Sequence, residues 1–476
     1  MRKVTPLLLL CLLTSCFKVG PQFRNPPAPA QADWMEECDE RVEVADLDLQ
    51  TWWELFEDPI LNELIAWGLS ENLPLKEAGM RILEARSILG IAVGDFFPQT
   101  QDMEGSAFHQ SISSNAPNTR FSDRFYWDYN LGMNVAWELD FWGKFRRLIE
   151  SSKQVLFATA ADYEQVRILL IADIASTYMG IRTLQERIDI IKSNIKVQER
   201  ALEIAQVRWE VGAVTELDVQ QAKAFLENTR TNLPLLQSEL RAAHNALAVL
   251  LGATPECLSP CFYGEGVVPE TSENVMVTVP CELLKNRPDV RASLYRLAAQ
   301  SELIGVAEAD LLPHISISGF VGFQSSGNNI FIASGSGGTL LSPSSFSATY
   351  GPSFSWPIFN YGRLTYRVRA EYARFYEFLF SYQNLSLNAY REVEDSIYAY
   401  LKNKEALESL GSGVEAALRS TALATAQYVD GFADYTRVLN SQQEQLLQQE
   451  RYVITKGDSA QSLISLYRSL GGGWQP

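Results

Sequence analysis

A seven-residue repeat of apolar side chains runs along the stretch between Gly143 and Val211. Its two apolar positions match the a and d positions of helices that supercoil, so we predict one long helix. A helix of about 65 residues would be on the order of 100 Å long, more than a globular core needs. Alone, the stretch indicates a generic coiled coil. One position holds Ile174, Ile181, Ile188, Ile195, Leu202 and Trp209, and the other holds Leu184, Ile191, Gln198 and Ala205.

The residues just before this helix alternate between apolar and polar or small side chains. Every odd position of the segment 125–139 is apolar, whereas most even positions are polar or small. A period of two predicts a β-strand with one apolar face. The strand is longer than the ~5–6 residues usual in soluble sheets, and aromatic residues stand at both ends. We therefore expect a membrane-type strand to lead into the long helix.

The chain contains an internal repeat. Residues 85–98 read ARSILGIAVGDFFP and residues 300–313 read QSELIGVAEADLLP, and each copy ends at a proline. Two alternating segments, separated by a polar loop, follow each proline. The four predicted strands cover residues 100–109, 125–139, 314–324 and 346–358.

A long helix follows the second strand of each copy. It begins at Lys144 or Arg363, meets Gly212 or Gly431 at the same distance, and restarts as a shorter helix. The unit of helix, strand, loop, strand, long helix and short helix is thus used twice. The predicted divisions are a signal peptide 1–15, a tether 16–58, a first repeat 59–251, a linker 252–286, a second repeat 287–470 and a tail 471–476.

Four membrane-type strands per chain constrain the assembly. A sheet in lipid cannot leave its edges open, and the smallest membrane barrels have eight strands. Two chains would give eight strands around a filled interior, and three would give twelve strands around a pore. We predict an α+β membrane protein in which a shared β-barrel continues into a cylinder of coiled-coil helices.

The first residues predict export and lipid attachment. Arg2 and Lys3 precede a short apolar region, and Leu13-Thr-Ser-Cys16 resembles a bacterial lipobox. We expect cleavage before Cys16 and acylation of that cysteine, which would hold this end in a membrane. The proline-rich residues that follow predict an extended tether.

Charge and motifs exclude several classes of protein. The net charge of −17 over 476 residues argues against a nucleic-acid partner; it suits a cation-favouring duct or an ordinary acidic surface equally. Glycine-rich residues 335–338 lack the Lys-Ser/Thr of a phosphate loop, and the three histidines are scattered. We expect no enzyme activity, no cofactor and no metal. Disulfide formation in an exported protein is left open for Cys38, Cys257, Cys261 and Cys281.

The lipobox, the repeat, the WWELFEDPILNELI segment and the SLYRSLGGGWQ ending resemble the TolC family of outer-membrane factors, in the lipoprotein branch that serves RND-type multidrug efflux. The resemblance covers essentially the whole mature chain. It implies a homotrimer with a twelve-stranded barrel in the bacterial outer membrane and a long α-helical barrel in the periplasm. A periplasmic adaptor and an inner-membrane pump are the implied partners.

The same resemblance implies a site at the ends of the long helices. The periplasmic entrance would lie at the Gly212 and Gly431 turns, with Thr436 and Asn440 facing the aperture. Many relatives have an apolar residue and an aspartate at these two positions, so this chain departs from an acidic ring. Arg437 stands where TolC itself has an acidic residue.

Two further roles follow from the family pattern. A ring of three Arg437 side chains would repel cations or pair with Asp218 and Asp434. The link that closes the inner coil against the outer coil carries over to Asp218 and Tyr428.

Three functions are compatible with these observations. The first is a passive exit duct for small molecules in a tripartite efflux system, gated at the periplasmic helix ends. The second is the outer-membrane duct of a type I protein secretion system, which the lipobox disfavours. The third is a structural coiled-coil envelope lipoprotein without a pore, which leaves the paired alternating strands unexplained.

Overall fold

The computed structural model describes residues 18–29, 33–44, 49–115, 124–262, 266–277, 280–327 and 339–474. The predicted signal peptide and Cys16 lie outside these residues. The chain forms two compact units. The first contains residues 1–26, 83–159 and 293–381, and the second contains residues 27–82, 160–292 and 382–476.

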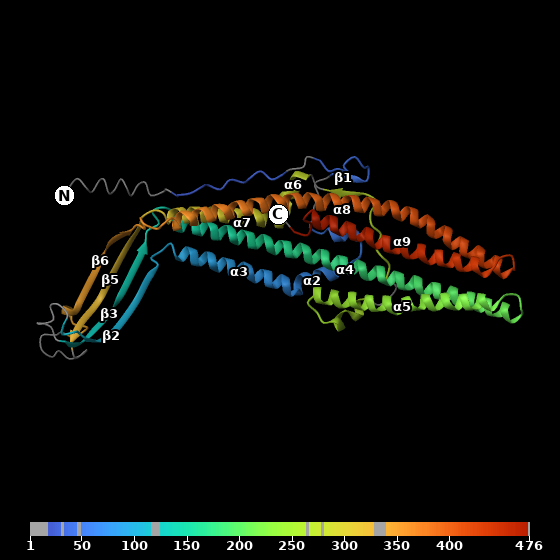
Figure 1. Ribbon diagram of the computed structural model, residues 1–476, viewed down its shortest axis with the longest axis horizontal. Coiled ribbons are helices and arrows are strands. Elements are labelled where there is room, and N and C mark those ends of the chain that lie inside the picture. The colour runs from blue at the N-terminus through green and yellow to red at the C-terminus, as the bar shows by residue number, and fades with distance from the viewer. Residues whose placement is uncertain are drawn as a thin grey trace. The chain divides into compact units, whose positions relative to one another are not determined.

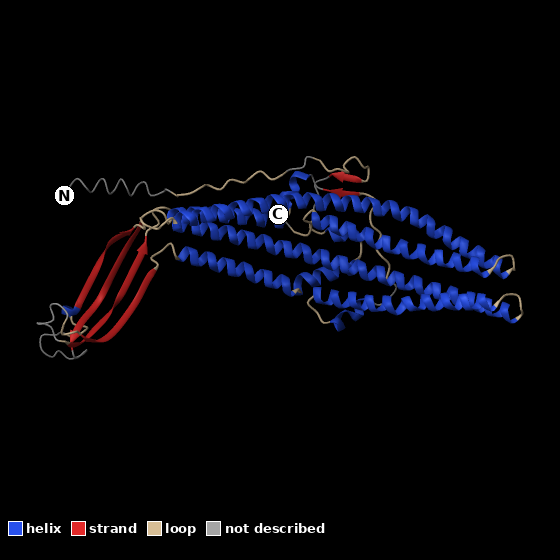
Figure 2. Ribbon diagram, viewed as in Figure 1, coloured by secondary structure: helices blue, strands red, loops and turns tan. Residues whose placement is uncertain are grey.

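The first unit contains a four-stranded antiparallel sheet with the order β2-β3-β5-β6 (Figure 2). The four predicted strands are all present. The fourth ends at Ser355 rather than at residue 358, because the chain turns after it and the Ile358 amide donates to the Trp356 oxygen at 2.9 Å. The third continues to Gly327, past the predicted residue 324. The bounds are β2 Thr100–Ser111, β3 Phe125–Glu138, β5 His314–Gly327 and β6 Phe346–Ser355.

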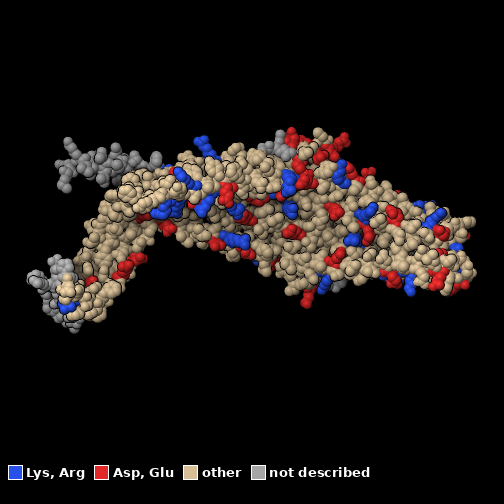
Figure 3. Space-filling model, in the orientation of Figure 1, with Lys and Arg blue, Asp and Glu red and all other residues tan. Residues whose placement is uncertain are grey.

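One face of this sheet is apolar. Met133 lies opposite Met103 on one side and Val321 on the other, so that apolar side chains continue across the strands. Several are exposed, among them Tyr350 (82%) and Phe354 (76%). The viewed face of the strand region is almost free of charged side chains (Figure 3). An extended exposed apolar surface of this kind suits contact with lipid.

Two tryptophans in equivalent positions fix the ends of the strands. Trp137 donates from Nε1 to the Phe96 oxygen at 3.1 Å, and Trp356 donates to the Leu311 oxygen at 3.0 Å. Phe96 and Leu311 occupy matching positions in the turns that enter the sheet. Each half of the chain thus closes its strand pair with the same contact.

Helices form most of the other described residues (Figure 1). The long helices α4 and α8 have 67 residues each, and α5 and α9 have 35 residues each. No helix of the described residues is both long enough and apolar enough to cross a membrane. The bounds are α2 Pro59–Glu71, α3 Leu73–Gly94, α4 Lys144–Glu210, α5 Glu216–Leu250, α6 Pro280–Asn286, α7 Pro288–Ala309, α8 Arg363–Val429 and α9 Tyr435–Ser469.

The seven-residue repeat describes only part of α4. Ile174 and Ile181 are completely buried, as predicted, but Ile195 is half-buried and Trp209 is 46% exposed. Toward the end of the helix the second predicted position stays buried, with Gln198 and Ala205, and Asn194 and Ala201 replace the first position on the buried side. A straight helix drifts by about 20° per heptad relative to a 3.5-residue repeat, which explains the rotation.

In the second unit, the amino-terminal segment packs against the carboxyl end of the chain and the linker. Trp52, in the 3-10 helix η1 (Trp52–Phe56), stacks on Tyr467 with a centroid distance of 5.6 Å. Trp474 donates to the Asn286 oxygen at 2.8 Å. Strand β1 (Val42–Val44) pairs in parallel with β4 (Val275–Val277) of the linker. These contacts place both terminal motifs of the resemblance in one packed region.

Two of the four cysteines considered above are free thiols. Cys38 and Cys257 are exposed and form no disulfide. The side chains of Cys261 and Cys281 lie outside the described part of the chain.

Candidate functional site

Two short turns join α4 to α5 and α8 to α9, and the structure places Gly212 and Gly431 in them (Figure 1). Both glycines have left-handed backbones, with φ of 76° and 83°. The next amide closes each helix end: Ala213 N–H donates to the Arg208 oxygen and Phe432 N–H to the Gln427 oxygen, both at 2.8 Å. This hydrogen-bond pattern is the Schellman motif, which favours glycine at the left-handed position.

A polar residue precedes the second helix of each hairpin, but only the side chain before α9 caps its helix. Asp434 accepts a hydrogen bond from the Arg437 amide at 3.2 Å, so its carboxylate caps α9. Thr215 precedes α5, and its hydroxyl donates to Asp218 Oδ1 at 3.4 Å. Both turns are therefore closed at each end by local hydrogen bonds.

The two hairpins pack together through small residues and two tyrosines. Alanines from three helices allow the backbones to approach closely, and Tyr428 and Tyr435 meet edge to face with centroids 5.5 Å apart. Burial raises the pKa of Tyr435 to about 12, with smaller contributions from Tyr428 and Asp218. The buried cluster consists of Ala201, Ala205, Val219, Ala222, Ala424, Tyr428, Tyr435 and Val438.

Arg208 ties the end of α4 to the end of α8. Its guanidinium donates to the main-chain oxygens of Tyr428 and, at 3.3 Å, Val429, and it lies 4.7 Å from the centroid of the Tyr428 ring. The last carbonyls of a helix lack helical partners and carry the negative end of its dipole, so a cation stabilises them. Sequence reasoning missed Arg208; its only signal was a basic residue in the last turn of α4.

The expected link between Asp218 and Tyr428 takes a different form. The Tyr428 hydroxyl is buried and has no hydrogen-bond partner among the described residues, while Asp218 accepts from Thr215. The two side chains still interact electrostatically, because burial and then the Asp218 charge raise the pKa of Tyr428. Arg208, not Asp218, makes the hydrogen bonds that join the coils at this tyrosine.

The three expected aperture residues share the exposed side of α9. Thr436, Arg437 and Asn440 are exposed, whereas Tyr435 and Val438 point into the cluster. The Arg437 guanidinium donates to Gln427 Oε1 at 3.3 Å. In the described part of the chain it forms no ion pair with Asp218 or Asp434.

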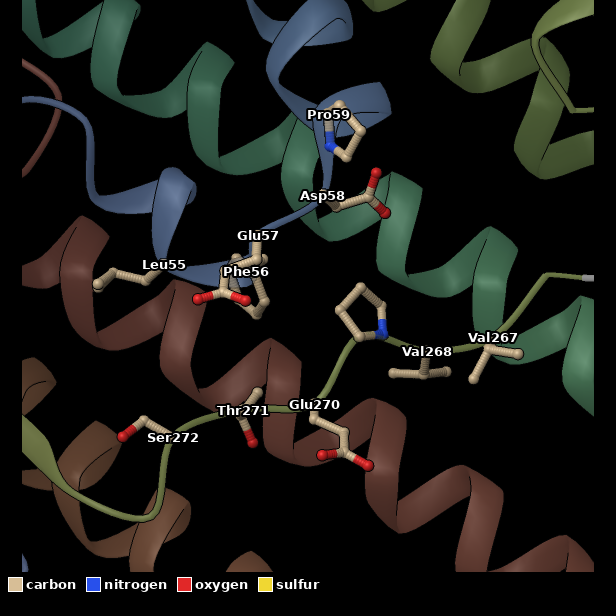
Figure 4. Close-up of a pocket in the computed structure, with 11 residues that line it drawn as sticks. Leu55, Phe56, Glu57, Asp58, Pro59, Val267, Val268, Glu270, Thr271 and Ser272 are labelled. Atoms are coloured by element: carbon tan, nitrogen blue, oxygen red, sulfur yellow. The ribbon is translucent and has the colours of Figure 1, made fainter.

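A cleft of about 640 Å³ lies elsewhere in the second unit, between residues 55–59 and 267–272 (Figure 4). One of its acidic side chains serves the fold: Asp58 caps α2 through the Ile60 amide at 2.9 Å and accepts a hydrogen bond from Tyr178. No cluster of His, Cys, Asp and Glu that could hold a metal occurs among the described residues.

Comparison with solved structures identifies the class of protein. The structure of the outer-membrane channel OprN matches with a TM-score of 0.89 and 33% identity, over 96% of this chain and 100% of that one. The fold is that of an outer-membrane channel, with strands for the membrane and long helices for the periplasm.

Curated relatives agree with the structural match. The outer membrane protein TtgF of a toluene efflux pump from Pseudomonas putida is 28% identical over 97% of this chain and 95% of its own length. The probable outer membrane lipoprotein SilC from Salmonella typhimurium is 24% identical over 99% of both. The outer membrane efflux protein family model matches residues 65–253 and 279–472. This chain belongs to the outer membrane efflux protein family, which confirms the predicted resemblance and the α+β fold.

Proposed function

We propose that this chain forms the exit duct of a tripartite efflux system, a passive channel for small molecules across the outer membrane. The observation that carries this proposal is the strand order, in which β2 and β6 are the outer strands of the sheet. Each has one edge without a partner strand among the described residues. Family membership and the efflux relatives support the same function.

The open edges require further copies of the chain. Unpaired backbone groups in hydrocarbon cost several kcal/mol each, so β6 of one copy must pair with β2 of the next. A contact between two different edges generates a ring when the rotation closes. Two copies would form an eight-stranded barrel with a filled interior, whereas three form a twelve-stranded barrel with room for a pore. We therefore infer a homotrimer.

The two faces of the sheet fit this ring. The face with Met103, Met133 and Val321 would meet lipid, and the opposite face, with Asp102 and Asn134 facing each other across β2 and β3, would line water. A polar interior inside an apolar outer band is the pattern of membrane barrels that contain a channel.

The hairpin ends would form the gate on the periplasmic side. Thr436, Arg437 and Asn440 lie exposed on α9, where three copies would bring them around one axis. Three Arg437 side chains, which form no ion pair among the described residues, would place positive charge around the axis and oppose cations there. Arg208, bound to the end of α8, would hold the two hairpins of each copy together in the closed state.

Anchoring and partners complete the proposal. Acylation of Cys16 would attach the chain to the outer membrane, in agreement with the lipoprotein relative. A periplasmic adaptor and an inner-membrane pump would engage the hairpin ends, and the pump would supply the energy of transport. We assign no catalytic step and no cofactor to the chain.

Copy number and partners test this function together. Native mass spectrometry of the detergent-solubilised protein is expected to show three copies, and purification from cells is expected to recover an adaptor and a drug pump. Recovery of an ATP-driven protein exporter instead would favour the secretion duct. A monomer without either partner would favour a structural lipoprotein.

A further inference from the structure

The segment Lys18–Pro21 packs against α4 and α7, within the first unit. The Val19 amide donates to the Trp142 oxygen at 3.1 Å, just before α4 begins. Lys18 packs against Gly143, where an added Cβ would come within 3.0 Å of its side chain. This segment, which we call the strap, follows the predicted acylation site Cys16 almost directly.

Arg147 is the centre of the strap-binding site. It is only 2% exposed, and its guanidinium donates to the Gly20 oxygen at 2.9 Å, the Pro21 oxygen at 3.0 Å and Glu302 Oε2 at 2.8 Å. A buried guanidinium is costly unless its donors are satisfied, and the strap carbonyls accept hydrogen bonds from both terminal nitrogens of Arg147. Its Nε has no hydrogen-bond partner among the described residues. The segment and the helices therefore stabilise each other.

Two glycines allow the strap to approach the helix backbone. An added Cβ on Gly305 would lie 2.2 Å from Arg147 Cδ and 2.7 Å from the Val19 oxygen. An added Cβ on Gly20, whose φ is +100°, would lie 2.6 Å from the Gly305 Cα. The strap and α7 thus touch backbone to backbone at this point, and neither glycine tolerates a side chain.

The repeat provides an internal comparison, because the other half of the chain lacks this site. Gly90 matches Gly305 in the repeat, yet nothing lies within 4 Å of a Cβ added there. The fourth residue of α4 is Arg147, whereas the fourth residue of α8 is Tyr366, which is 65% exposed. One copy of the unit therefore carries a binding site for an extended peptide, and the other copy does not.

We propose that Arg147, Glu302 and Gly305 form a dedicated site for the strap and that this site couples the lipid anchor rigidly to the helices. The anchor would then fix the position of α4 and α7 at the membrane instead of acting as a loose tether. This inference rests on the proposed acylation of Cys16, but the docking of the strap can be measured without it.

Cleavage of the Lys18–Val19 bond by a lysine-specific protease measures docking in the full-length detergent-solubilised protein. A docked strap must detach before cleavage, so the rate reports the detached fraction. Gly305→Ala is expected to raise the rate at least about tenfold, and the matched variant Gly90→Ala is expected to leave it unchanged. Gly20→Ala changes the strap and leaves the helices intact, and it is expected to raise the cleavage rate by a similar factor. It therefore tests docking even if Gly305→Ala folds poorly.

Wild-type cleavage rates in both Gly305→Ala and Gly20→Ala, or equal acceleration by Gly90→Ala, would overturn the site. The mass of the released amino-terminal peptide reports acylation independently. A peptide without acyl chains would contradict the anchor while the docking result stood.

Trimer yield in the outer membrane tests the coupling. If the anchor acts through the strap, Gly305→Ala, although acylated, is expected to lose trimers to the same extent as Cys16→Ser, and Gly90→Ala is expected to keep them. A deficient Cys16→Ser beside a normal Gly305→Ala would show that the anchor acts without docking. A normal Cys16→Ser would also contradict the coupling.

Discussion

The guanidinium of Arg208 donates a hydrogen bond to the main-chain oxygen of Tyr428, so the last turn of α4 caps the last turn of α8. These helices belong to different copies of the repeated unit. The contact holds together the two hairpins that we place at the periplasmic entrance, and we propose that Arg208 contributes to gating through it.

Replacement of Arg208 by alanine is expected to loosen the hairpin ends. Hydrogen bonds to a charged group are worth about 1.5–3 kcal/mol. Their loss removes a partner from the Tyr428 and Val429 oxygens, and among the described residues only the Tyr428 oxygen keeps a hydrogen bond, from the Gly431 amide. Hydrogen exchange of the amides in the Phe432 turn is expected to accelerate. Arg200→Ala is the matched control, because within the described residues Arg200 forms only an exposed ion pair with Glu203 on its own helix. Equal protection in both variants would contradict the cap.

Removal of the Tyr428 hydroxyl tests whether the coils are joined by Arg208 or by a direct hydrogen bond between Tyr428 and Asp218. The hydroxyl is buried without an acceptor among the described residues, so Tyr428→Phe is expected to change the free energy of unfolding by no more than about 0.5 kcal/mol. Tyr428→Ala leaves a cavity in the cluster and is expected to lower the free energy of unfolding by about 3–5 kcal/mol. Denaturant titration of both variants measures this. A large loss in Tyr428→Phe would show that the hydroxyl bonds to Asp218 after all.

Stability at high pH is expected to depend on Tyr435. Burial raises its pKa from the ordinary value near 10 to about 12, which means that folding favours the neutral phenol. The contribution is fully present below about pH 10 and is lost as the pH rises from about 10 to about 12. Between pH 7 and 12, the free energy of unfolding should therefore fall less steeply with pH in Tyr435→Phe than in the wild type. Identical slopes would contradict the burial of this group.

Substitution of a turn glycine is expected to destabilise the turn because of its left-handed backbone. Nothing lies within 4 Å of a Cβ added to Gly212, so the cost of Gly212→Ala is the strain of φ 76°. That strain is about 1–2 kcal/mol and should appear as faster exchange of the Ala213 amide. Gly90→Ala, inside α3 and equally free of contacts, is the control, and it should be neutral or stabilising.

Local patterns predicted much of the fold. Alternation located all four strands, because the side-chain period of a strand is visible over a few residues. The glycines marked both helix turns for a similarly local reason, since a left-handed backbone favours glycine. The alternation of Trp356 and Ile358 concealed the end of the last strand, because the turn between these two residues keeps the same apolar spacing.

Contacts between distant segments were not predictable in the same way. The cap on α8 by Arg208 and the strap carbonyls on Arg147 join residues that are far apart in the chain, and no period records them. Beyond Ile188 the heptad pattern failed at one of its two positions, which holds Ile195, Leu202 and Trp209. The other position stays buried, with Ile191, Gln198 and Ala205. Gln198 is buried there, although its position in the repeat offered only a polar residue.

Single-channel current across a planar lipid bilayer tests the central claim most directly. Three copies enclosing a water-lined barrel are expected to give discrete current steps with the purified wild-type protein, and larger or longer openings with Arg208→Ala. Absence of any current from intact, membrane-inserted oligomers of both proteins would contradict the duct.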